Sequence, residues 1–113
     1  MHEYSIVSAL LDRVKEEAER HRAASVSRLS VRIGDESGVV ADLVAYAFEI
    51  LREGTLCASA ELAIDRVAAR WSCPACGSLG DGDRPLWCTK CDGPRKLEAG
   101  DEIILDRIEM EVP

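Results

Sequence analysis

Four of the five cysteines of this chain are arranged as two CxxC pairs. Cys73 and Cys76 form the first pair, Cys88 and Cys91 form the second, and eleven residues lie between the pairs. Two intervening residues let the chain curl so that both thiolates face one ion, and a glycine shortly after each pair permits the tight turn. Four thiolates complete a tetrahedron around a d¹⁰ cation and leave no position for a substrate. The spacing therefore predicts a structural zinc site.

Four other interpretations of these cysteines must be weighed. Iron suits the same S₄ tetrahedron, and spacing does not separate the two metals. A redox CxxC pair normally stands alone at a helix start within a thioredoxin-like pattern, which this chain lacks, and unpaired buried cysteines rarely repeat at ligand spacing. A zinc hydrolase would need an open metal position and a general base within reach. We therefore expect no enzymatic activity.

His2 is the second candidate metal ligand. An imidazole at the second position can close chelate rings with the α-amine of Met1 and with its own deprotonated amide, and Ni(II) and Cu(II) prefer such a nitrogen-rich tetragonal set. Glu3 adds a carboxylate beside this set. The alternative is a frayed, solvated chain end without bound metal.

Two further residues of reactive type fit structural roles. Cys57 has no partner at ligand spacing, and we expect a small hydrophobic side chain that enters the second strand. His21 lies at the polar end of the first predicted helix, where the helix dipole favours a solvated cation.

The elements that must position these residues follow from the apolar periodicity. Spacings of three and four predict helices over residues 5–22 and 39–52, and alternation predicts strands over 26–33, 60–71 and 102–112. Within 60–71 the apolar parity changes, which a bulge or a change of buried face near Asp65 and Arg66 would reconcile. No apolar period survives between 72 and 100. The cysteine segment is therefore an insertion between two strands, which we expect to be neighbours.

These elements predict an α/β fold: a small three-stranded mixed sheet packed with two helices, with a zinc-ribbon-like Cys₄ module inserted between strands two and three. The length of 113 residues fits one domain with one small appended module. We place the α/β domain in residues 1–71 plus 98–113 and the inserted zinc-binding domain in residues 72–97.

The net charge of −7 repels phosphate backbones and anionic lipid, so we expect no nucleic-acid partner and no membrane partner. No apolar run approaches the ~20 residues that span a bilayer, and the first residues lack the pattern of a signal peptide. These features indicate a cytoplasmic protein. A zinc-ribbon module that binds a protein or a nucleic acid, without nickel, is the alternative function.

Several segments occur together in a familiar order. They are Met1-His2-Glu3 running directly into an amphipathic helix, Val31-Arg32-Ile33-Gly34, Ala47-Phe48-Glu49, Glu61-Leu62-Ala63-Ile64, the paired CxxC motifs and Gly100-Asp101-Glu102-Ile103. In this order the sequence resembles the HypA/HybF family over essentially its whole length. One departure is Thr89, where many relatives have a proline after the first cysteine of the second CxxC pair.

The resemblance implies a nickel metallochaperone that delivers Ni(II) during maturation of [NiFe]-hydrogenase and, in some organisms, of urease. By position it implies nickel at His2, with backbone nitrogens around Met1, His2 and Glu3, and structural zinc at Cys73, Cys76, Cys88 and Cys91. The implied partners are a HypB-type GTPase, the precursor of the hydrogenase large subunit and, where urease is served, urease maturation proteins.

Overall fold

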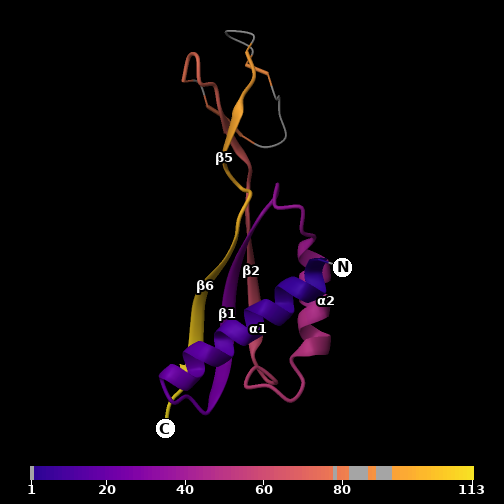
Figure 1. Ribbon diagram of the computed structural model, residues 1–113, viewed down its shortest axis with the longest axis vertical. Helices are drawn as coiled ribbons and strands as arrows, with labels where there is room; N and C mark the ends of the chain where they lie inside the picture. The colour runs from indigo at the N-terminus through magenta and orange to yellow at the C-terminus, as the bar shows by residue number, and fades with distance from the viewer. Residues whose placement is uncertain (1, 78, 82–86, 89–92) are drawn as a thin grey trace.

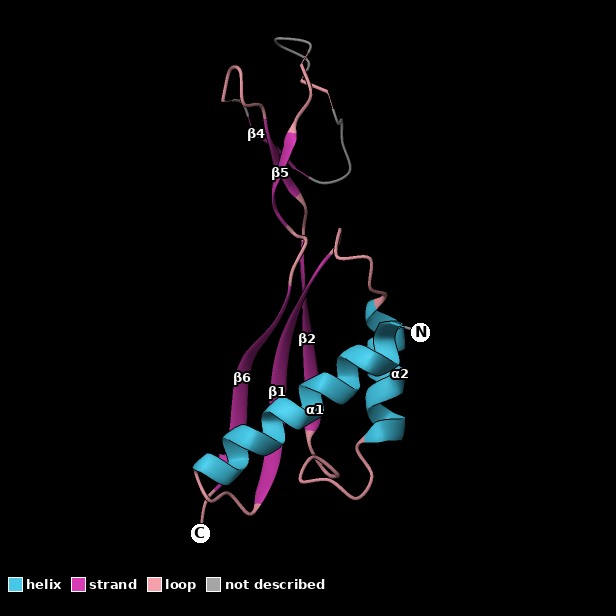
Figure 2. Cartoon of the chain, viewed as in Figure 1, coloured by secondary structure: helices cyan, strands magenta, loops and turns pink. Residues whose placement is uncertain are grey.

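The computed structural model describes residues 2–77, 79–81, 87–88 and 93–113 and has an elongated shape, 58 × 26 × 17 Å. Two small sheets follow one another along its long axis, and both helices lie beside the first sheet (Figures 1 and 2). No helix in this described part of the chain combines the length and apolar character needed to cross a bilayer. In chain order the elements are α1 (His2–Arg20), β1 (Ser25–Gly34), α2 (Ala41–Leu51), β2 (Glu61–Val67), β3 (Arg70–Ser72), β4 (Leu79–Asp81), β5 (Lys96–Ala99) and β6 (Ile103–Glu111).

The first sheet has the strand order β2-β1-β6, with β1 parallel to β2 and antiparallel to β6. Figure 2 shows α1 crossing the sheet obliquely, and α2 lies beside the amino-terminal half of α1. The core is aliphatic apart from Phe48, and its fully buried members include Val7 and Val14 from α1, Leu29 and Val31 from β1 and Val44 from α2. The predicted fold class, a mixed three-stranded sheet with two helices, is confirmed.

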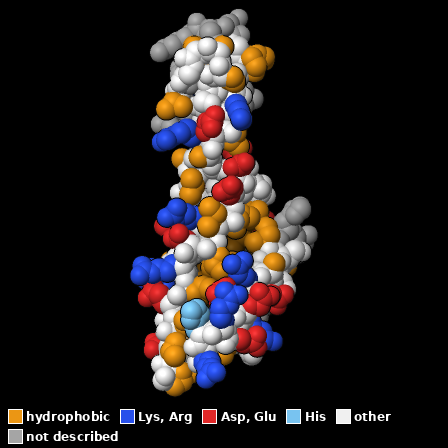
Figure 3. All heavy atoms as spheres, turned by 60° about the vertical axis from the view of Figure 1, so that its left-hand side comes forward, with side chains coloured by type: hydrophobic (Ala, Val, Ile, Leu, Met, Phe, Trp, Pro, Cys, Tyr) orange, Lys and Arg blue, Asp and Glu red, His pale blue; other side chains and the backbone are white. Residues whose placement is uncertain are grey.

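The alternate residues of β1 carry charge instead. Arg28 lies between Glu61 on β2, with an N···O distance of 2.8 Å, and Glu109 on β6, with a distance of 3.9 Å. Arg32 pairs with Asp106 of β6 at 3.5 Å. Such cross-strand rows let one face of a sheet contact water. Figure 3 likewise shows basic and acidic side chains intermixed over the visible face of this half of the molecule, with no separate basic field.

The prediction of one strand over residues 60–71 is wrong. β2 ends at Val67, and Arg70 starts β3 in the other sheet. The pairing of β1 with β2 runs without interruption from Arg28↔Glu61 to Gly34↔Val67, so there is no bulge near Asp65. The apolar parity changes because the chain leaves the first sheet at residues 68–69.

The expectation that the second and third predicted strands are neighbours is also wrong. β2 and β6 occupy opposite edges of the first sheet, and β1 lies between them. The helix α2 joins β1 to β2 as a crossover connection, which brings these two strands together in parallel. β1 therefore offers its other edge to β6.

In the second sheet, which has the order β4-β3-β5, only the first two residues of β3 fall in a predicted strand, the one over 60–71, and β4 and β5 are not predicted. Its strands have three or four residues each, too few for alternation to be recognised. β3 extends across the predicted domain boundary at 71/72, and β5 extends across the one at 97/98. The division into domains 1–71 plus 98–113 and 72–97 stays a prediction.

The backbone at Gly34 passes very close to the backbone at Gly100 where the two sheets meet. The N–H of Gly34 donates to the carbonyl oxygen of Glu102 at 2.9 Å, and the N–H of Glu36 donates to that of Gly100 at 2.7 Å. A Cβ on Gly34 would lie 2.1 Å from the Gly100 carbonyl oxygen, and Gly100 itself has a φ of +99°. This backbone crossing fixes the end of β1 to the connection between β5 and β6.

We expect Gly34→Ala to lower the free energy of unfolding by about 3 kcal/mol, because backbone atoms must move to admit the methyl group. The measurement is a urea titration followed by far-ultraviolet circular dichroism of the helices. Gly38→Ala is the control for loss of a glycine without a clash: a Cβ there meets nothing within 4 Å, although Gly38, unlike Gly34, has a positive φ of +80° that itself disfavours alanine. Equal losses for the two variants would contradict a role for the crossing.

Candidate metal centre

Three of the four predicted zinc ligands lie together. The sulfur atoms of Cys73, Cys76 and Cys88 all lie within 4.8 Å of one another, and the Cys76–Cys88 distance is 3.5 Å. Zn–S bonds of about 2.3 Å in a tetrahedron place sulfur atoms about 3.8 Å apart, whereas a disulfide bond measures about 2.05 Å. The sulfur spacing therefore fits three thiolates that share a metal ion. Cys91, the fourth predicted ligand, lies outside the described residues.

Short turns at the end of the second sheet present these cysteines. Cys73 directly follows β3, and its carbonyl oxygen accepts a hydrogen bond from the N–H of Gly77 at 2.7 Å. Gly77 has a φ of +74°, as expected for the glycine that closes the first CxxC turn. The N–H of Cys88 donates to the carbonyl oxygen of Gly93 at 2.7 Å. Backbone hydrogen bonds thus close the first CxxC turn and hold Cys88 against Gly93.

The chemistry of this cluster suits a bound metal ion. Cys73 and Cys88 are buried, while Cys76 is exposed at the surface of the turn. Within the described ranges it is the one group of three or more His, Cys, Asp or Glu residues whose ligand atoms come close enough to bind one ion. A set made of thiolates suits zinc or iron and provides no general base for hydrolysis.

The second candidate site lies at the start of α1. His2 is the first residue of this helix, while Met1 and the His2 side chain are outside what the structure describes. The Glu3 carboxylate oxygen Oε2 accepts a hydrogen bond from the N–H of Val40 at 3.4 Å. Val40 is the N-cap residue of α2 and provides no side-chain cap. Glu3 therefore caps α2 from another helix and holds the amino ends of α1 and α2 side by side (Figure 1).

Sequence reasoning missed this contact between Glu3 and Val40. Valine at the N-cap position shows only that no side chain there can accept from the N–H groups of residues 42 and 43. The contact itself serves the N–H of Val40 and depends on the tertiary approach of α1 to α2, for which the sequence carries no local signal.

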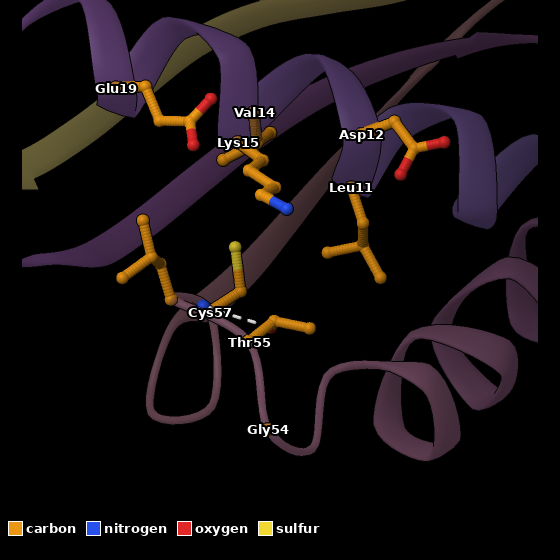
Figure 4. Close-up of a pocket in the computed structure, with 9 residues that line it drawn as sticks. Leu11, Asp12, Val14, Lys15, Glu19, Gly54, Thr55 and Cys57 are labelled. Atoms are coloured by element: carbon orange, nitrogen blue, oxygen red, sulfur yellow. Dashed lines mark hydrogen bonds between the residues drawn. The ribbon is translucent and has the colours of Figure 1, made fainter.

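Cys57 is buried, as expected, in the loop that precedes β2. Its side chain points into a groove of about 550 Å³ between this loop and α1 (Figure 4). Burial raises the pKa of the Cys57 thiol, and the nearby Arg52 guanidinium only partly opposes this. The thiol therefore stays protonated at neutral pH and is not an activated nucleophile. The groove is lined by Leu11, Asp12, Val14, Lys15, Glu19, Gly54, Thr55, Leu56 and Cys57.

His21 also behaves as expected. It is exposed just beyond the end of α1, where its N–H donates to the carbonyl oxygen of Glu17 at 3.2 Å. The other histidine, His2, starts the same nineteen-residue helix. The two histidines thus lie at opposite ends of α1 and cannot share a metal ion.

Comparisons with known proteins agree with this arrangement. The chain matches, over residues 1–110, the family described as "Hydrogenase/urease nickel incorporation, metallochaperone, hypA". It is 37% identical over 113 residues to a hydrogenase maturation factor HypA of Dehalococcoides mccartyi, covering 98% of this chain and 95% of the relative. It is also 37% identical to a HypA of Wolinella succinogenes, covering 98% and 96%.

Solved structures show the same fold. The solution structure of the nickel metallochaperone HypA from Helicobacter pylori superposes with a TM-score of 0.72 at 30% identity and covers 98% of both chains. Another solution structure of a HypA protein gives a TM-score of 0.72 at 29% identity, covering 100% of this chain and 98% of that one. The helices, the mixed sheet and the clustered cysteines therefore have a common explanation: the chain belongs to the HypA family of nickel metallochaperones, whose role is nickel incorporation during hydrogenase maturation and not catalysis.

Proposed function

We propose that this protein binds Ni(II) at its amino terminus and delivers it during maturation of [NiFe]-hydrogenase. The ligands in this proposal are the α-amine of Met1, the imidazole and backbone nitrogen of His2, and Glu3. The partners are a HypB-type GTPase and the hydrogenase large-subunit precursor in the cytoplasm. In an organism that contains urease, the same cargo would also serve urease maturation proteins.

The observation that supports the nickel site best is the position of His2 as the first residue of α1. The first N–H groups of a helix have no acceptor within the helical hydrogen-bond ladder, and the N–H of His2 is one of them. Replacement of that amide proton by a metal ion therefore breaks no hydrogen bond of the helix. The Glu3–Val40 contact supports the same site because it holds this end of α1 against α2. The nitrogen ligands would then start from a fixed position and not from a frayed tail.

Zinc at Cys73, Cys76, Cys88 and Cys91 has a different role in this proposal. A closed thiolate cage holds its ion and leaves no vacancy, whereas a site at the chain end is open and exchangeable. The division into a nickel-binding domain, 1–71 plus 98–113, and a zinc-binding domain, 72–97, belongs to the same proposal. The zinc module stabilises its own small sheet, and the amino terminus carries the cargo.

Elemental analysis of untagged protein tests this proposal. Before addition of Ni(II) we expect one zinc per chain, and after addition and desalting one zinc and one nickel. A matched protein with a Gly-Ser extension before Met1 should keep its zinc and lose most of its nickel, because the α-amine becomes an amide. Full nickel affinity in the extended protein would contradict amine ligation. If neither protein took up nickel, the nickel site would be contradicted, and the alternative function of a zinc-ribbon module without nickel would be favoured.

A further inference from the structure

The helix α2 presents apolar side chains to solvent as well as to the core. Its inner face buries Val44 and Phe48, yet Leu43 is 48% exposed, Tyr46 61% and Ile50 46%. Among the described residues, eight large hydrophobic side chains are exposed, and four of them belong to α2 or to its N-cap residue, Val40. Scattered exposed apolar residues need no explanation, whereas a concentration on one helix indicates a contact surface.

These exposed residues form a continuous line. Leu43, Tyr46 and Ile50 are spaced by three and four residues, so their side chains follow one another along one side of α2. Asp42 and Glu49 are seven residues apart, which is two helical turns, and they lie along the edge of this line that faces away from the core. Both side chains are exposed, and the Glu49 carboxylate forms an ion pair with Arg52 at 3.1 Å. We call the three apolar residues the α2 stripe and the two carboxylates its acidic edge.

We propose that the α2 stripe is the docking surface for an amphipathic helix of a partner protein, with apolar residues at three- and four-residue spacing and Lys or Arg along the side that meets the acidic edge. The spacing of the stripe fits the apolar face of a helix. Arg52 partly neutralises Glu49, so Asp42 contributes most of the negative charge that favours a basic flank on the partner. A neutral or acidic helix would bury the same apolar area without this complementarity.

A second copy of the chain fits this surface poorly. Antiparallel packing of two α2 helices about a two-fold axis would place the two acidic edges against each other. Each chain also carries a net charge of −7, so association brings like charges together. The charge pattern therefore favours a basic partner over self-association.

The position of the α2 stripe also matters. It starts at the amino end of α2, where the N–H of Val40 is bonded to Glu3, and Figure 1 shows the amino terminus beside this end of the helix. A partner seated on α2 would therefore lie next to the proposed nickel site. This last consequence rests on the proposed function, whereas docking itself requires no nickel.

The test uses a fluorescently labelled designed peptide as the probe and zinc-loaded, nickel-free protein. The peptide carries Leu at helical spacing and Lys along one flank; one control peptide replaces each Lys by Glu, and another has the same residues in scrambled order. We expect the Lys peptide to bind at least about tenfold more tightly than either control, as measured by fluorescence anisotropy. Tyr46→Ser should weaken its binding by about tenfold or more, and Asp42→Asn together with Glu49→Gln should remove its preference over the Glu peptide.

Val112→Ser is the matched control, since Val112 is 57% exposed but lies beyond β6, outside α2. It should leave binding of the Lys peptide unchanged. Equal binding of the Lys and Glu peptides, or no loss on Tyr46→Ser, would overturn the proposal. Self-association in sedimentation experiments that Tyr46→Ser abolishes would also overturn it and would identify a second copy as the occupant. Because nickel is absent throughout, these outcomes do not depend on the nickel site.

Discussion

Replacement of Cys73 by serine is expected to release the zinc and unfold the second sheet, while the first sheet and its helices stay folded. Cys73 directly follows β3, the central strand of the second sheet, and its sulfur is one of the three that lie within 4.8 Å of one another. A serine hydroxyl is a poor zinc ligand at neutral pH because it stays protonated. Loss of this one thiolate therefore opens the tetrahedron at the residue that joins it to the sheet.

The large expected effect follows from how little else stabilises this part of the chain. The core cluster formed by the described residues takes no member from residues 65–102. Strands of three or four residues are too short to be stable without packing or a cross-link. Structural zinc contributes on the order of 10 kcal/mol to small metal-dependent folds. Without the metal we expect this region to lose its structure completely.

The two tryptophans make the outcome measurable. Trp71 lies in β3 and Trp87 pairs with Pro94 beside Cys88, so tryptophan fluorescence reports on the second sheet alone. The far-ultraviolet helix signal reports on α1 and α2, which belong to the other half. For Cys73→Ser we expect no bound zinc, a red-shifted Trp71 emission and an unchanged helix signal.

Cys57→Ser is the matched control because it changes the one cysteine that is not a predicted ligand. We expect this variant to keep its zinc and its tryptophan spectrum. It should instead lower the stability of the helical part by roughly 1–3 kcal/mol, since it places a hydroxyl at a site that is only 1% exposed. Full zinc occupancy in Cys73→Ser, or loss of the helix signal together with the tryptophan change, would contradict the assignment.

The parts of the fold that the sequence could predict are those where many residues repeat one signal. The apolar face of α1 recurs over nineteen residues, and β1 alternates between Arg28 and Ile33 around Leu29 and Val31. The CxxC pairs are equally specific because two residues between cysteines determine where the sulfur atoms can point. Periodicity and ligand spacing are local properties, so a single sequence contains them.

The features that could not be predicted depend on contacts between distant residues. The break at residues 68–69 leaves no local signal except a change of parity, which a bulge explains equally well. The crossing of Gly34 over Gly100 joins positions that are far apart in the chain, and the Glu3–Val40 hydrogen bond joins two helices. Similarly, β1 separates β2 from β6 through long-range pairing that alternation does not encode.

Replacement of His2 by alanine is expected to weaken Ni(II) binding by about 100-fold or more and to leave the zinc content unchanged. Loss of groups that only orient metal ligands costs about 10–100-fold in affinity, and the imidazole in the proposed site is itself a ligand. Its removal also breaks the chelate ring that makes the neighbouring backbone nitrogen a good donor. The zinc cysteines begin at Cys73, in the other half of the molecule, so they should not respond.

His21→Ala is the matched control, because the chain contains two histidines and His21 lies exposed at the opposite end of α1. Competition of each protein with a metal-binding dye measures the nickel affinity, and the visible absorption of bound Ni(II) reports whether its ligand set is tetragonal. Wild-type protein and His21→Ala should give the same affinity and the same spectrum. If His2→Ala matched them while zinc stayed bound, nickel could not be held by the amino terminus, since removal of the one imidazole there would have had no effect.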